Sequence, residues 1–234
     1  MNRTPRLRCF DLDGCVVESD AAIADGLRHA ARLVGVPMLD AEGVRAAIGP
    51  PLRSTFRTML SDAGIDPDDE EGALLLDTAV AAYRARYAEV GFDLTRPVPG
   101  IVALLERLGD SGGGTTVIVT AKPAAVAEPL LVHVGLRHHF DVVHGAPMGP
   151  AVEEKRVTLA RALVVADARP AEAVMIGDRS HDIAAGRACG TRTFGVLWGA
   201  GDRVELERAG AERVLARPEE LEPLLVSRGR PAGR

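Results

Sequence analysis

Lysine, cysteine and the aromatic residues are all scarce in this chain of 234 residues. Aromatic residues account for 3% of the sequence and hydrophobic residues for 47%, so a core must consist mainly of Ala, Val, Leu and Ile. The three cysteines, Cys9, Cys15 and Cys189, form no C-x-x-C pair, which excludes the common zinc and dithiol patterns. We expect all three to be reduced thiols.

Long apolar runs and an excess of positive charge are missing as well. The longest apolar segments are too short for a membrane-spanning helix, which needs about 18 residues. The first eight residues lack the apolar stretch of a signal peptide. A net charge of −5 provides no overall positive field for nucleic acid. We therefore expect a cytoplasmic protein whose partners include neither membranes nor nucleic-acid polymers.

The sequence pattern divides the chain into a strand, a helical stretch and an alternating stretch. A short buried strand is expected over residues 7–11, followed by the turn Asp13-Gly14. From residue 19 to residue 91 the apolar residues recur at helical spacing, and no convincing strand interrupts them. The last of these helices is expected to begin with Asp66 as its N-cap and Pro67 at its first position, and to end near Val90.

Beyond Pro97 the pattern changes to helices that alternate with short β-rich runs. This alternation is typical of a parallel sheet that is covered by helices on both faces. We predict an α/β fold, a Rossmann-like doubly wound parallel sheet, with an all-helical cap domain inserted into it. The core would comprise residues 1–17 and 96–234, and the cap residues 18–95. The expected strands after the cap cover residues 116–119, 141–143, 174–176 and 193–196.

Three polar residues follow predicted strands directly. They are Asp11, Thr120 and Asp178, and the carboxyl ends of parallel strands meet at the edge of the sheet where ligands bind. Two carboxylates and a hydroxyl suit a hard cation such as Mg²⁺ together with a phosphate. Lys155 is expected to join them from the start of a helix. The residue types therefore indicate phosphoryl transfer.

A charge argument explains why both a metal and a lysine are expected. At an effective dielectric of about 20, a carboxylate about 4 Å from a phosphate dianion is repelled by about 4 kcal/mol per pair of charges. One Mg²⁺ and one ammonium nearly offset the dianion together with Asp11 and Asp178. Asp13, two residues beyond Asp11, would protonate the leaving oxygen and then activate the water.

The two lysines support the same interpretation. The chain has 28 basic residues, and only Lys122 and Lys155 among them are lysine. Both lie in segments that we expect to form loops of the site, where a compact point charge suits a phosphate oxygen. Lys122 either contacts the phosphate or closes its loop over Pro123.

Four segments, in order, resemble the motifs of the haloacid dehalogenase-like phosphatases: DLDG at 11–14, VTAKP at 119–123, Lys155, and GDRSHD at 177–182. The resemblance implies that Asp11 is the nucleophile and a metal ligand. It implies that Asp13 is the acid–base residue and offers its carbonyl to Mg²⁺. Thr120 and Lys155 would bind phosphate. The metal set would thus be Asp11, Asp13 and Asp178, with Asp182 as a supporting acid.

Within that superfamily, the segments at 48–52, 120–123 and 195–201 resemble the phosphoglycolate phosphatase and 5′-nucleotidase-like branch. Cys15 and Ala121 depart from its usual Thr and Ser, and we expect activity to survive both changes. Two of the candidate residues have an alternative role: Asp182 could cap its helix, and Arg53 could form surface ion pairs. The candidate residues for substrate binding are Gly14, Gly49, Arg53, Ala121 and Lys122.

The expected function is Mg²⁺-dependent hydrolysis of a small phosphomonoester through a phospho-aspartate. Phosphoglycolate, a nucleoside monophosphate and a sugar phosphate all remain open as substrates, because the cap loops choose the leaving group. A phosphosugar mutase would use the same two aspartates. A catalytically silent protein that binds a phosphometabolite is the alternative from another class, although it could dispense with Asp11 or Asp13.

Overall fold

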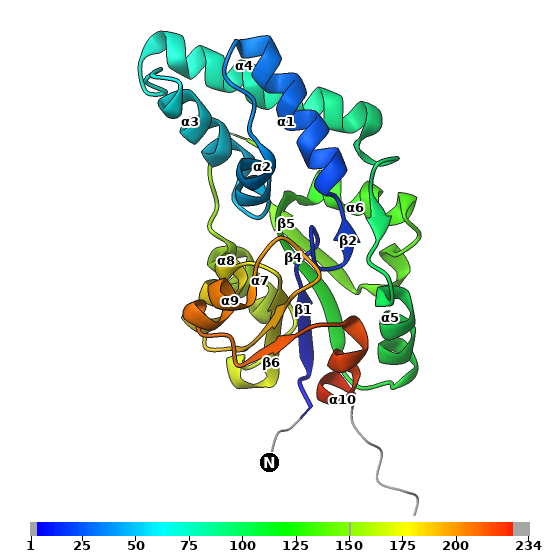
Figure 1. The fold of residues 1–234 in the computed structure, drawn as a ribbon. Coiled ribbons are helices and arrows are strands. Elements are labelled where there is room, and N and C mark those ends of the chain that lie inside the picture. The colour runs from blue at the N-terminus through cyan, green and yellow to red at the C-terminus, as the bar shows by residue number, and fades with distance from the viewer. Residues whose placement is uncertain (1–3, 150, 227–234) are drawn as a thin grey trace, which may run out of the picture.

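The computed structural model describes residues 4–149 and 151–226. Its centre is a sheet of six strands in the order β5-β4-β1-β6-β7-β8, and every neighbouring pair is parallel (Figure 1). The predicted α/β fold is therefore confirmed. The strands are β1 (Leu7–Phe10), β4 (Thr115–Pro123), β5 (Val142–Ala146), β6 (Ala173–Gly177), β7 (Arg192–Val196) and β8 (Arg213–Leu215).

Helices cover both faces of the sheet. Successive residues of a strand point to opposite faces, so Cys9 of β1 packs in one apolar cluster and Phe10 in another. The Cys9 side is covered by α7 (Lys155–Val165) and α8 (Ser180–Ala188), and the Phe10 side by α5 (Ile101–Asp110), α6 (Ala124–His133) and α10 (Glu222–Leu225). Helix α9 (Arg203–Ala209) packs on α8. Single 3₁₀ turns cover Arg137–His139, Pro170–Glu172 and Pro218–Leu221.

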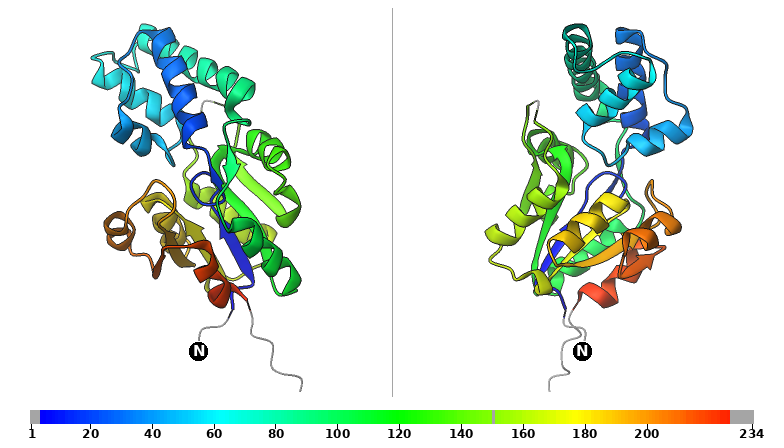
Figure 2. Two further views of the ribbon diagram at one scale, coloured as in Figure 1. Left: turned by 45° about the vertical axis from the view of Figure 1, so that its right-hand side comes forward. Right: turned by 90° about the vertical axis from the view of Figure 1, so that its left-hand side faces the viewer.

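A block of helices lies beyond the carboxyl ends of the strands, as Figures 1 and 2 show. It comprises α1 (Asp20–Val34), α2 (Ala41–Ala47), α3 (Leu52–Asp62) and α4 (Glu70–Arg86), and the π-helical turn Tyr87–Gly91 continues α4. The block has an apolar core of its own, with Leu27, Phe56 and Leu76 among its buried members. The chain enters and leaves it through β2 (Val17–Glu18) and β3 (Arg96–Pro97), which pair antiparallel. That the block forms a separate cap domain over residues 18–95 stays a prediction.

The start of α4 differs from the prediction. Asp66 was expected to be the N-cap, but its side chain accepts a hydrogen bond from Asp68 N at 2.9 Å and forms a local turn. Asp69 caps the helix instead, because its Oδ1 accepts from Gly72 N at 2.7 Å. Several aspartates stood near this helix start, and their spacing alone did not decide which one would be the cap.

Two of the three predicted strand-end residues lie where they were expected. Asp11 follows β1 and Asp178 follows β6, and these two strands are neighbours in the sheet. The prediction for Thr120 was wrong, since β4 continues through Thr120 to Pro123. The register between β4 and β5 shifts between Thr120 and Pro123, so Thr120 still lies at the point where regular pairing ends. None of the helices within the described ranges is long and apolar enough to span a membrane.

Candidate active site

Three buried carboxylates meet at the carboxyl edge of the sheet. Asp11, Asp178 and Asp182 each place one oxygen within 4.8 Å of the other two, and all three side chains are buried. Asp11 and Asp178 come from the ends of adjacent strands, and Asp182 comes from the first turn of α8. This arrangement follows from the topology, because parallel neighbours deliver their carboxyl ends to one place.

Lys155 neutralises part of this charge. It is the first residue of α7, and its Nζ lies 2.8 Å from Asp11 Oδ1 and 2.5 Å from Asp182 Oδ1. Burial lowers the pKa of Lys155, but the attraction of the two carboxylates outweighs burial and raises that pKa above its ordinary value. Asp182 also accepts a hydrogen bond from Arg179 N at 3.0 Å. Asp182 therefore both caps the start of α8 and orients Lys155.

One ammonium does not balance three carboxylates. Burial raises the pKa of Asp11 to about 7, with Lys155 acting in the opposite direction. Burial, together with the charges of Asp182 and Asp11, also raises the pKa of Asp178 well above its ordinary value. Buried like charges are unfavourable unless a positive charge compensates them. The cluster thus has an excess of negative charge, which a divalent cation would neutralise.

The donor atoms of the cluster also fit a hard divalent cation. Asp178 Oδ2 accepts a hydrogen bond from Ala200 N at 2.7 Å, whereas its buried Oδ1 has no partner among residues 4–149 and 151–226. A buried carboxylate oxygen without a partner is costly and is the kind of ligand that Mg²⁺ takes. The residues present therefore fit a Mg²⁺ ion.

A loop that follows β7 holds Asp178 in place, a role that was not predicted from the sequence. A Cβ atom on Gly199 would lie 2.3 Å from Asp178 Oδ2, and one on Gly14 would lie 2.4 Å from the same atom. Both positions therefore require glycine, and Gly14 also has a φ of +79°. Trp198 Nε1 donates to Cys15 O at 3.0 Å and ties the two loops together. The Gly-rich segment after a predicted strand was the available signal.

Asp13 is not a member of the cluster of three carboxylates and has hydrogen-bond partners of its own. Its Oδ1 accepts hydrogen bonds from Lys122 Nζ and from Ser19 Oγ, each at 2.7 Å. Its carboxylate therefore does not belong to the cluster, whose third acid is Asp182 instead. Asp13 as a metal ligand through its carbonyl stays a prediction. The two aspartates have different cationic partners, Lys155 for Asp11 and Lys122 for Asp13.

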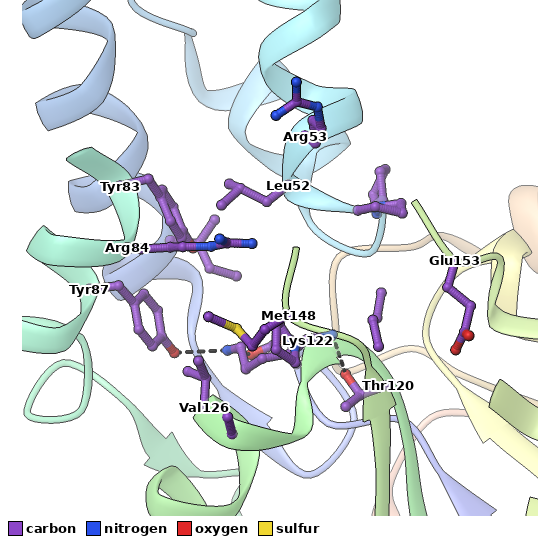
Figure 3. A pocket seen from close by; sticks show the side chains of 18 of the residues that line it. Leu52, Arg53, Tyr83, Arg84, Tyr87, Thr120, Lys122, Val126, Met148 and Glu153 are labelled. Atoms are coloured by element: carbon purple, nitrogen blue, oxygen red, sulfur yellow. Dashed lines mark hydrogen bonds and ion pairs between the residues drawn. The ribbon is translucent and has the colours of Figure 1, made fainter. Parts of the chain in front are cut away.

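Lys122 links Asp13 to the helical block. Its Nζ donates to Tyr87 Oη at 2.8 Å, and Tyr87 lies in the π-helical turn after α4 (Figure 3). Burial lowers the pKa of Lys122, but Asp13, Tyr87 and Tyr83 together outweigh burial and raise that pKa. The backbone N of Lys122 donates to Thr120 Oγ1 at 3.2 Å. A π-helical turn is often found at a functional site, and here it brings a tyrosine to the core.

A cavity of about 520 Å³ lies between the core and the helical block. Thr120, Lys122 and Lys155 line it together with Asp11 and Asp13, so both lysines of the chain face one space. The predicted substrate residues Gly49, Arg53 and Ala121 also line it, whereas Gly14 packs behind Asp178. Arg53 forms an ion pair with Asp77 at 2.5 Å, and Figure 3 shows its guanidinium turned away from the cavity.

Comparisons with known proteins agree with this architecture. A family model described as haloacid dehalogenase-like hydrolase matches residues 9–196. A phosphoglycolate phosphatase of Caulobacter vibrioides is 30% identical over 88% of this chain and 84% of its own length, which confirms the expected resemblance to that branch. The solved structure of a predicted phosphatase from Clostridium acetobutylicum has a TM-score of 0.85 and 26% identity, covering 94% of this chain and 98% of that one.

A relative with another name is also similar. The tyrosine-protein kinase PtkA of Mycobacterium tuberculosis is 34% identical over 85% of this chain. The chain spans only 64% of the length of that relative.

Proposed function

The chain belongs to the haloacid dehalogenase-like hydrolase family, and from that premise we propose that it is a Mg²⁺-dependent phosphatase. Its substrate is a phosphomonoester of a small metabolite, and the phosphoryl group passes through a phospho-aspartate on Asp11. The observation that carries the proposal is that Asp11 lines the cavity while its carboxylate is buried and held by Lys155. The similarity to a phosphoglycolate phosphatase supports the reaction class.

Asp11 is the nucleophile in this mechanism. Its carboxylate attacks phosphorus while the bond from phosphorus to the leaving oxygen breaks. Lys155 Nζ lies 2.8 Å from Asp11 Oδ1, and Thr120 is on the neighbouring strand; both residues line the cavity and bind the phosphoryl oxygens. A Mg²⁺ ion held by Asp11, Asp178 and the carbonyl of Asp13 would supply the remaining charge neutralisation.

Asp13 moves the proton. It donates a proton to the leaving oxygen, and afterwards it takes one from the water that attacks the phospho-aspartate. Because Asp13 accepts from Lys122 and Ser19, its carboxylate is held in one orientation in the lining of the cavity that Asp11 also lines. Lys122 is a positioning residue in this proposal, and Tyr87 positions Lys122 from the helical block.

Changing Tyr87 to Phe tests that role. Removing the hydroxyl leaves the Lys122 ammonium with one acceptor fewer. A hydrogen bond to a charged group contributes about 1.5–3 kcal/mol, and only part of that reaches the transition state because Tyr87 acts through Lys122 and Asp13. We expect kcat to fall about 5-fold while KM changes less than about 2-fold. Tyr83→Phe is the matched control, since the Tyr83 hydroxyl has no hydrogen bond to any residue that the structure describes. Equal kinetics for Tyr87→Phe and Tyr83→Phe would remove Tyr87 from the mechanism.

Phosphate release from a panel of phosphomonoesters tests the proposed function. The panel contains phosphoglycolate, nucleoside monophosphates, sugar phosphates and 4-nitrophenyl phosphate, each assayed with MgCl₂ and with a chelator. We expect phosphate release with Mg²⁺ and a fall in its rate of at least about 100-fold with the chelator. Without the metal, the excess negative charge of the carboxylate cluster repels the phosphate dianion that Asp11 attacks. No release from any compound would contradict the proposal and favour the silent binder.

Transfer to an acceptor other than water is the second candidate, since one relative is named a tyrosine-protein kinase. A phospho-aspartate reacts with a hydroxyl as it does with water, so the two activities share the first step. A mutase differs in the same way, because it returns the phosphoryl group to a sugar hydroxyl. Product analysis separates the three: free phosphate identifies the phosphatase, a rearranged sugar phosphate the mutase, and phosphotyrosine on a supplied peptide the kinase.

A further inference from the structure

Among the residues that the structure describes, one charged side chain of the cavity has no ion-pair partner. Asp11, Asp13, Arg53, Lys122, Glu153 and Lys155 are paired with other side chains. Arg84, on the last turn of α4, lines the cavity and is partly buried. Within the described part of the chain its guanidinium makes no ion pair or side-chain hydrogen bond. Figure 3 shows it extending from the helical block into the space above Met148.

The contrast with Arg86 shows that this isolation is a property of the position. Arg86, two residues further along the same chain segment, is held by Asp25 at 2.6 Å and by Glu89 at 3.0 Å and does not line the cavity. A partly desolvated guanidinium gains most from an anion, and it presents two parallel donors to a carboxylate or a phosphate. Within the described ranges, Arg84 therefore lacks the anionic partner that Arg86 has.

Much of the cavity lining is apolar. Leu52 and Ile23 come from the helical block, and Val126 and Met148 come from the core. Their side chains can contact carbon atoms of a ligand but cannot hydrogen-bond to hydroxyls. A cavity of about 520 Å³ also has room for more than a two-carbon leaving group.

We propose that the substrate is a phosphomonoester whose leaving group has an apolar body and a second anionic group, and that Arg84 binds this second anion. The proposal rests on the proposed function and names the substrate class of the same cavity. Phosphate binds at Asp11 and Lys155, the apolar body lies on Leu52, Val126 and Met148, and the second anion pairs with Arg84. Arg84 is then the residue that selects the substrate.

Binding of non-hydrolysable phosphonates tests the proposal without requiring turnover. Calorimetry compares ω-carboxyalkyl phosphonates of one to six methylenes with alkyl phosphonates of matching length, in MgCl₂. We expect the carboxylate to tighten binding by about 10- to 100-fold at one chain length in wild type, as for a charged hydrogen bond. The gain should disappear in Arg84→Gln and remain in Arg86→Gln. Replacing the terminal carboxylate with a phosphonate at that length decides between a carboxylate and a phosphate.

Three results would overturn the inference: no chain length with a carboxylate preference, a preference that survives in Arg84→Gln, or no binding of any phosphonate. The proposed function is read independently from hydrolysis of 4-nitrophenyl phosphate by the same preparations. Hydrolysis without a carboxylate preference in binding would reject the role of Arg84 and leave the phosphatase proposal standing. A preference without hydrolysis would keep the anion site and reject the phosphatase.

Discussion

Asp11→Asn should reduce kcat for phosphate release by at least about 10⁴-fold, which is typical of the loss of a covalent nucleophile. The amide is uncharged and does not form an acyl phosphate, so neither hydrolysis nor transfer to another acceptor can proceed by this route. The side chain keeps its size in a position that is 3% exposed. Wild-type protein treated with substrate and quenched in acid should gain the mass of one phosphoryl group on Asp11, and the variant should gain none.

The unfolding midpoint of Asp11→Asn provides the control. The substitution removes one of three buried carboxylates while Lys155 keeps its contact with Asp182, so stability in metal-free buffer should not fall. Asp110→Asn, at the exposed end of α5, is the matched substitution outside the site and should keep wild-type activity. Residual turnover in Asp11→Asn above about one-hundredth of wild type, from a folded protein, would mean that Asp11 is not the nucleophile.

The fold and the base of the site could be predicted because their signals are local in the sequence. Asp11 and Asp178 each stand at the end of a short β-rich run, and the parallel arrangement brings such ends together. The rarity of lysine pointed to Lys122 and Lys155, and in the structure both line one cavity. No tertiary information was needed for these residues.

The rest depended on contacts between distant segments, which periodicity and spacing do not report. Tyr87 reaches Lys122 because α4 ends in a π-helical turn, and the helical pattern continued through that turn without a visible break. Gly199 is required by the carboxylate of Asp178, 21 positions earlier in the chain. Arg84 and Arg86 are indistinguishable as sequence, and only the fold turns one into the cavity and pairs the other with Asp25.

Asp11 and Asp13 are close in the sequence but have different partners in the structure. Two aspartates separated by one residue after a strand suggest a pair that shares one metal. In the structure they have different cationic partners, with Lys155 beside Asp11 and Lys122 beside Asp13. Two carboxylates that must attack and transfer a proton in turn are best kept in separate environments, and the two lysines provide that separation.

Lys155→Met should affect stability and activity together, because Lys155 is the only cation in contact with the carboxylate cluster among the described residues. Met keeps most of the buried volume and removes the charge. Breaking a buried pair leaves uncompensated carboxylates and costs about 3–5 kcal/mol of unfolding free energy, measured by urea denaturation in metal-free buffer. We expect kcat/KM to fall at least about 10³-fold, while Thr120→Ala, which removes one neutral hydroxyl, should cost about 10-fold.

A second variant separates the electrostatic cause from a packing defect. Asp182→Asn added to Lys155→Met removes a carboxylate that has lost its cation, so the double variant should regain part of the lost unfolding free energy. Activity should not return, since the ammonium beside Asp11 is still missing. If the second change gives no gain in stability, Met packs badly and charge is not the cause. If Lys155→Met and Thr120→Ala show equal and small losses in kcat/KM, then Lys155 does not bind the phosphoryl group, and the charge balance proposed for the site is wrong.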